Sequence, residues 1–101
     1  MKIVKINALI GNVVLKRFKE ILRNEIETLI DSGILDKVMQ YVNKDDILNS
    51  VNSIYISGDY LAVSNSYEGK IIRLLHFGGP GLKATNILTT CERKLKGGLL
   101  W

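Results

Sequence analysis

The stretch Lys70–Leu95 reads KIIRLLHF, then GGPG, then LKATNILTTCERKL. Its first piece is rich in β-branched and large apolar residues and has no breaker, which predicts a buried strand over 70–77. The glycines and Pro80 that follow predict a tight corner, because glycine tolerates positive φ and proline fixes its own φ. The third piece predicts a C-terminal helix, because its apolar residues have helical spacing. These residues are Ala84, Ile87, Leu88, Cys91 and Leu95.

The chain before this stretch opens with a predicted strand and a long helix. Residues 2–6, KIVKI, predict an edge strand, because lysines flank the β-branched pair. The apolar period then changes from 2 to 3.6, which predicts an amphipathic helix over 13–42 with Asn12 as its N-cap. At Gly33 either this helix bends, or Gly33 ends one helix and Ser32 starts another. The apolar stripe of the helix comprises Val14, Leu15, Phe18, Ile21, Leu22, Ile26, Leu29 and Ile30.

A hairpin is predicted between the long helix and the corner. Asp45 or Asp46 is expected to cap a short helical turn before it. Residues 54–57, IYIS, and 60–64, YLAVS, are joined by a Gly-Asp turn, so they predict paired antiparallel strands. With the strand at 70–77 they would form a three-stranded meander.

The predicted fold class is α+β. A long N-terminal helix and a C-terminal helix pack on a small antiparallel sheet, in a single domain over 1–101. Gly97-Gly98 is expected to end the last helix, and the apolar residues Leu99-Leu100-Trp101 follow it.

Composition narrows the class of protein. A chain of 101 residues with 47% hydrophobic and 24% charged residues predicts one folded domain rather than a disordered segment. No apolar run approaches the roughly 18 residues of a membrane span, and the N-terminus does not have the pattern of a signal peptide. A single cysteine predicts an intracellular site of folding. The net charge of +4 permits a nucleic-acid neighbour without requiring one.

The residues that carry catalysis are scarce. His76 is the only histidine and Cys91 the only cysteine, so a Cys/His pair across the corner is formally conceivable. Cys91 lies on the apolar face of its predicted helix, however, which favours a core role. A metal site needs three or four ligands, which these two residues do not supply. The GGPG corner precedes a helix and could hold an anion, but it lacks the Lys-Ser/Thr of a phosphate loop. We therefore predict no catalytic, metal or cofactor site and no enzymatic activity.

Two surfaces are candidates for binding. A basic face on the long helix is either a solvated surface or a weak contact for nucleic acid, and it comprises Lys16, Arg17, Lys19 and Arg23. Apolar residues of the hairpin and the C-terminal end predict an oligomer interface, and they are Tyr55, Tyr60, Leu99, Leu100 and Trp101.

The order of these pieces resembles the small head–tail joining, or tail-completion, proteins of long-tailed bacteriophages. In that family an opening strand of the form M-x-I-x-I-x-G-L precedes a long amphipathic helix, as MKIVKINALIG and 13–42 do here. A segment of the form T-G-x-L-x-x-S-I follows, and Leu48 and Ser50 match its Leu and Ser. A strand then runs into E-F-G-T before a helix with Ala-x-x-(Phe/Ile)-Leu. Here HFGG, Ala84 and the NIL at 86–88 stand in those places.

The resemblance implies a virion structural protein without catalytic residues. It would assemble in the host cytoplasm as a ring, a hexamer, at the neck between head and tail, with other neck and tail proteins as partners. Non-specific contact with DNA in the channel is left open. This chain has His76 where the family has an acidic residue and Gly79 where it has Thr. The residues alone also allow an alternative, a small basic domain that binds nucleic acid or acts as a regulator.

Overall fold

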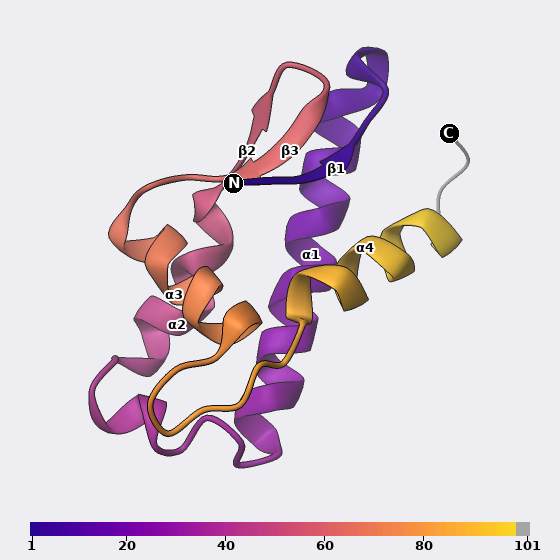
Figure 1. Cartoon of the computed structure of the whole chain (residues 1–101). Coiled ribbons are helices and arrows are strands. Elements are labelled where there is room, and N and C mark those ends of the chain that lie inside the picture. The colour runs from indigo at the N-terminus through magenta and orange to yellow at the C-terminus, as the bar shows by residue number, and fades with distance from the viewer. Residues whose placement is uncertain (99–101) are drawn as a thin grey trace.

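The computed structural model, which describes residues 1–98, has an α+β fold built along one long helix (Figure 1). This confirms the predicted fold class. The elements are β1 (Lys2–Lys5), α1 (Gly11–Asp31), α2 (Lys44–Asn49), β2 (Ile54–Ser57), β3 (Tyr60–Val63), α3 (Tyr67–Phe77) and α4 (Ile87–Gly98), with 3-10 turns at η1 (Ala8–Ile10), η2 (Val38–Gln40) and η3 (Ser50–Ser53).

The helix α1 starts two residues earlier than predicted, at Gly11 rather than Val13, and Asn12 is not its cap. Ile10 occupies the N-cap position and makes no side-chain hydrogen bond there. Instead the side chain of Asn7 accepts a 3.0 Å hydrogen bond from the N–H of Leu9 and caps the 3-10 turn η1. The chain therefore enters α1 through a preformed turn, and Gly11 is buried against Ile56 of β2.

The predicted helix over 13–42 is wrong in its last third. Gly33 has a φ of +83°, which only glycine adopts without strain, and α1 ends before it at Asp31. The chain then folds back as turns and η2, burying Leu35 and Val38 against the core. Gly33 thus breaks the helix, and no long second helix starts at Ser32.

The hairpin is confirmed. In the antiparallel pair β2–β3, Ile54 lies opposite Val63 and Ile56 lies opposite Leu61, as the alternation predicts. The third strand is not 70–77, however. It is β1, which pairs antiparallel with β3, so the sheet order is β1-β3-β2 and β1 is an edge strand as expected.

The segment 70–77 is helical rather than extended, which corrects the central prediction of the sequence analysis. It belongs to α3, whose N-cap Ser66 accepts a 3.1 Å hydrogen bond from the N–H of Gly69. Ile71, Ile72 and Leu75 form its buried face, a spacing that fits a helix as well as the β-branched composition fits a strand. The N-cap at Ser66 is what distinguishes a helix from a strand here.

The glycine corner exists, and it joins two helices. Gly78 and Gly81 have φ values of +80° and +79°. Gly79 and Leu82 exchange backbone hydrogen bonds of 2.9 and 3.0 Å, which close the turn. Ala84 is exposed and precedes α4, so it does not belong to the helix face on which it was placed.

The apolar face of α4 is otherwise as predicted. Its buried residues are Ile87, Leu88, Cys91 and Leu95. The helix continues through Gly97 and Gly98, so these glycines do not end it before the last described residue. Asn43 rather than Asp45 or Asp46 caps α2, by accepting a 2.7 Å hydrogen bond from the N–H of Asp45.

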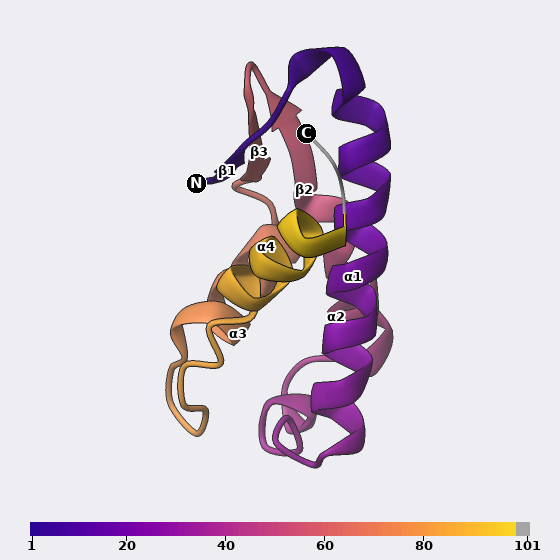
Figure 2. The same cartoon turned by 90° about the vertical axis from the view of Figure 1, so that its right-hand side faces the viewer.

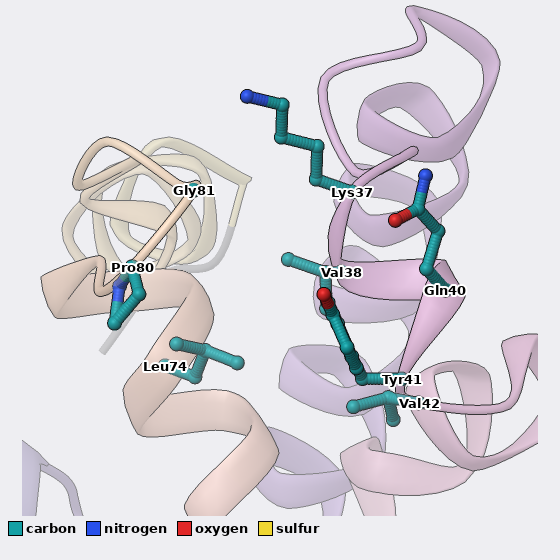
Figure 3. A pocket seen from close by; sticks show the side chains of 8 residues that line it. All are labelled: Lys37, Val38, Gln40, Tyr41, Val42, Leu74, Pro80 and Gly81. Carbon is teal, nitrogen blue, oxygen red and sulfur yellow. The ribbon is translucent and has the colours of Figure 1, made fainter.

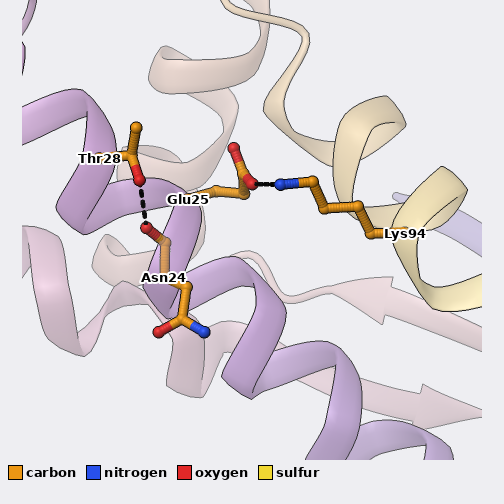
Figure 4. Close-up of polar contacts among 4 residues, drawn as sticks. All are labelled: Asn24, Glu25, Thr28 and Lys94. Atoms are coloured by element: carbon orange, nitrogen blue, oxygen red, sulfur yellow. Dashed lines mark hydrogen bonds and ion pairs between the residues drawn. The ribbon is translucent and has the colours of Figure 1, made fainter. Parts of the chain in front are cut away.

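Figure 2 shows that the sheet, α2 and α4 are arranged along α1. The sheet lies beside its N-terminal half, α2 beside its C-terminal half, and α4 crosses it while also touching β1 and α3. Phe18, Leu22 and Ile26 of α1 are fully buried. Glu25 of α1 points toward Lys94 of α4 and pairs with it across this crossing (Figure 4).

The start of α3 yields a test of this packing. A Cβ on Gly69 would lie 1.9 Å from the backbone oxygen of Ser64, whereas a Cβ on Gly97 would meet nothing within 4 Å. We expect Gly69→Ala to lower the free energy of unfolding by about 1–3 kcal/mol, because a backbone segment must move. Gly97→Ala, the matched control, should raise it by up to about 1 kcal/mol by reducing the entropy of the unfolded chain. Denaturant melts of the two variants measure both changes, and equal effects would contradict the close approach at Gly69.

Candidate functional site

A hollow lies between the segment that follows α1 and the glycine corner (Figure 3). We call it the corner groove. It has a volume of about 570 Å³, within the range of binding pockets, and draws its walls from three parts of the chain. Its lining residues are Lys37, Val38, Gln40, Tyr41, Val42, Leu74, Pro80 and Gly81.

The chemistry of the corner groove is mainly apolar. Val38 and Leu74 point toward one another from opposite walls (Figure 3). Tyr41 is 87% exposed, although the nearby residues Met39 and Val42 are partly buried. The stem of Lys37 closes one end, because its Cδ lies 3.5 Å from where a Cβ on Gly81 would be. Such a surface suits an apolar or aromatic side chain rather than a charged ligand.

The corner itself is a structural turn and not an anion cradle. The N–H of Gly78 donates to the carbonyl of Leu74 at 2.8 Å, and that of Gly79 donates to Leu82. Pro80 has no N–H to offer. Three successive positions of the predicted loop are therefore unable to donate to a bound phosphate, which favours the structural reading of GGPG.

His76 lies at the end of α3 and holds the start of α4. Its Nδ1 accepts a 3.2 Å hydrogen bond from the N–H of Leu88. This supports the prediction that its hydrogen bond is satisfied, although the residue is on a helix rather than at a strand end. Next to it, the hydroxyl of Thr85 donates to the carbonyl of Leu75 at 2.6 Å. Burial lowers the pKa of His76 from its usual range.

Cys91 is fully buried on the face of α4 that meets α1. Burial, with a smaller contribution from the nearby carboxylate of Glu25, raises the pKa of the Cys91 thiol to about 12. The thiol is therefore protonated at neutral pH and is not the thiolate that a Cys/His pair would need. Both residues of the conceivable pair have structural contacts of their own.

The predicted basic face lies on α1 with mixed charge. Lys16, Arg17 and Arg23 are exposed and Lys19 is half-buried. Arg17 pairs with Glu20 at 3.4 Å, and Arg23 pairs with Glu27 at 3.4 Å. Because carboxylates neutralise two of the four cations, the field that this face offers to a phosphate backbone is weaker than the basic residues alone suggest.

Tyr55 and Tyr60 share one face of the sheet. Tyr55 lies opposite Ala62 and Tyr60 lies opposite Ser57, so the strand register brings both rings to the side away from Ile54 and Ile56. Tyr55 is 45% exposed, whereas Tyr60 is half-buried with the ammonium of Lys2 4.6 Å from the centre of its ring. The predicted interface at Leu99, Leu100 and Trp101 lies outside the described residues.

Sequence reasoning missed the corner groove because two of the three chain segments that line it differ from their predicted structures. Residues 37–42 fall in the predicted long helix, and Leu74 falls in the predicted strand over 70–77. The sequence nevertheless contains a signal for the true structure of each of these two segments. Gly33 can end a helix with positive φ, and a serine three residues before Gly69 has the spacing of an N-cap.

Comparison of the chain with known protein families, curated proteins and solved structures finds no match. Within residues 1–98, no helix combines the length and the apolar character needed to cross a bilayer. The same part of the chain contains no group of three or more His, Cys, Asp or Glu side chains arranged to hold a metal ion.

The contact between His76 and Leu88 predicts a pH dependence of stability. The pKa of His76 is lowered in the folded state relative to its ordinary value of 6.5, so the unfolded chain binds more protons as the pH falls below that value. The free energy of unfolding should therefore fall between about pH 7 and pH 5, because His76 is the only side chain with an ordinary pKa in this window. Urea melts across this range measure the change.

His76→Asn is the matched control, because its side-chain oxygen can accept the same hydrogen bond without titrating there. The carboxylates are common to both proteins, so their contribution cancels in the comparison. We expect a smaller loss of stability on acidification in the variant. Identical pH profiles would show that His76 does not link α3 to α4 in this way.

Proposed function

We propose that the protein is a structural assembly protein that forms a homo-oligomeric ring at the junction between the head and tail of a tailed phage or a related particle. The observation that carries this proposal is the presence of exposed aromatic side chains on two different surfaces, Tyr41 at the corner groove and Tyr55 on the sheet. The corner groove lies at one end of the molecule, and the sheet face with Tyr55 and Tyr60 lies toward the other (Figure 1). A head-to-tail contact joins two unlike surfaces, and it closes into a ring when its rotation permits.

Some of the residues that carry the family resemblance occupy positions consistent with the same proposal. Ser50 is fully buried just before β2, where its hydroxyl donates to the carbonyl of Ile47. The HFGG sequence ends α3 and begins the corner, with Gly78 at positive φ. The expected strand leading into HFGG is wrong for this chain. The resemblance therefore depends on the opening strand, the long helix, the segment around Ser50 and the final helix.

In such a ring, α1 could present its basic face to DNA passing through the channel. The ion pairs of Arg17 and Arg23 indicate a weak contact that salt would screen. The same pairs make an independent role as a nucleic-acid-binding domain less favourable than the assembly role.

The mass of the protein in solution and its place in a particle test the proposal. Light scattering over a concentration series should give multiples of the 11.3 kDa chain, with six copies as the family resemblance implies. In purified tailed particles from the same source, mass spectrometry should detect the chain, and a reconstruction should place it at the neck. Tyr55→Ser should shift the series toward the monomer, because it removes an exposed aromatic anchor.

Tyr67→Ser is the matched control, because Tyr67 is also an exposed tyrosine, 57% accessible, but lies at the start of α3. It should leave the assembly unchanged. A monomer at every concentration, together with absence of the chain from the particles, would overturn the proposed function.

A further inference from the structure

The corner groove needs an occupant whose chemistry matches its walls. Val38, Val42, Leu74 and Pro80 give it apolar sides, and the exposed ring of Tyr41 gives it a flat aromatic wall. Apolar surface gathered in a hollow of this kind usually marks a contact with another molecule or segment. A segment with one large aromatic and some aliphatic side chains would suit both parts of the groove.

The sequence supplies such a segment directly after α4. Leu99-Leu100-Trp101 follows Gly98, the last described residue, and it contains the only tryptophan of the sequence. The last residues of α4, Lys96, Gly97 and Gly98, are exposed, and a Cβ on either glycine would meet no atom within 4 Å. The apolar sequence Leu99-Leu100-Trp101 therefore follows directly on an exposed helix end.

This segment cannot reach the groove of its own subunit. In Figure 1 the end of α4 and the corner groove lie on opposite sides of α1, and Figure 2 also places the helix end nearer the sheet. Three residues span at most about 10–11 Å. A helix with its side chains is already about 10–12 Å across. The groove that receives this segment must therefore belong to a second copy of the chain.

We infer that Leu99–Trp101 of one subunit docks in the corner groove of the next. This inference rests on the proposed function and names one of the contacts that would build the ring. The indole of Trp101 stacks on the exposed ring of Tyr41 and on Pro80, and the leucines cover Val42 and Leu74. The ammonium of Lys37, at the end of the groove, can lie over the indole face. The helix end and the groove are unlike surfaces, as a head-to-tail contact requires.

The fluorescence of Trp101 tests this inference directly, because no other tryptophan contributes to the emission. In the full chain, the emission should shift to shorter wavelength as the concentration rises and the ring forms, since the indole leaves water. Tyr41→Ser should raise the dissociation constant of the assembly roughly tenfold or more, as the loss of a central aromatic anchor does. Tyr41 is 87% exposed, so this variant should keep the fold, which circular dichroism checks. Tyr67→Ser should behave like the unmodified chain.

A mixture of two variants, each defective in one half of the contact, tests the docking most sharply. A chain lacking residues 99–101 keeps the groove, and the Tyr41→Ser chain keeps the segment. Each alone should fail to form rings at concentrations where the full chain does, and an equimolar mixture should form a dimer of one copy of each. Such a dimer is the result expected from a single remaining head-to-tail contact.

The outcomes separate this inference from the proposed function. Rings that form while the Trp101 emission stays constant, or that tolerate both variants, would overturn the docking inference and leave the proposed function standing. A full chain that stays monomeric at every concentration and is absent from particles would overturn the proposed function itself. An emission shift that is the same at every dilution would show docking within one subunit and would also overturn the inference.

Discussion

The burial of one apolar face of α1 is the interaction on which the rest of the structure depends. Phe18, Leu22 and Ile26 are fully buried on this face, and burying each such side chain stabilises the fold by about 1.5–3 kcal/mol. The sheet, α2 and α4 all pack against α1, so it is the wall that these elements share. The corner groove depends on it too, because the segment that forms one wall starts where α1 ends and is held by the buried side chain of Leu35.

Much of the fold could be predicted because its signals are local. The period of 3.6 in the apolar stripe indicated α1, and alternation around the Gly58-Asp59 turn indicated the hairpin. The pairing of β1 with β3 could not be read in this way, because it joins residues about sixty positions apart and no turn marks it. A short apolar run such as 70–77 fits a strand or a buried helix, and only its cap distinguishes them. Here the N–H of Gly69 donates to Ser66, and the backbone of Ser64 lies where a Cβ would be.

For the candidate surfaces, too, local features could be predicted from the sequence and features that depend on the tertiary structure could not. The hairpin register that brings Tyr55 and Tyr60 to one face of the sheet is a local property, but the burial of each ring is not, and Tyr60 is half-buried whereas Tyr55 is exposed. The basic residues lie on α1 as expected, but the ion pairs that weaken their field depend on side-chain conformations that a sequence pattern does not give. The corner groove was missed because it exists only when the segment after Gly33, the helix α3 and the glycine corner are brought together.

The shared role of α1 is tested most directly by native-state hydrogen exchange. If the other elements depend on this helix, the amides of Phe18–Ile26 should exchange only through global unfolding, with the same free energy as the slowest amides of β3. The amides of α4 should then show an equal or lower free energy of opening, because its buried residues pack on α1. Exchange of the Phe18–Ile26 amides through local opening, well below the global free energy and while β3 stays protected, would contradict the account.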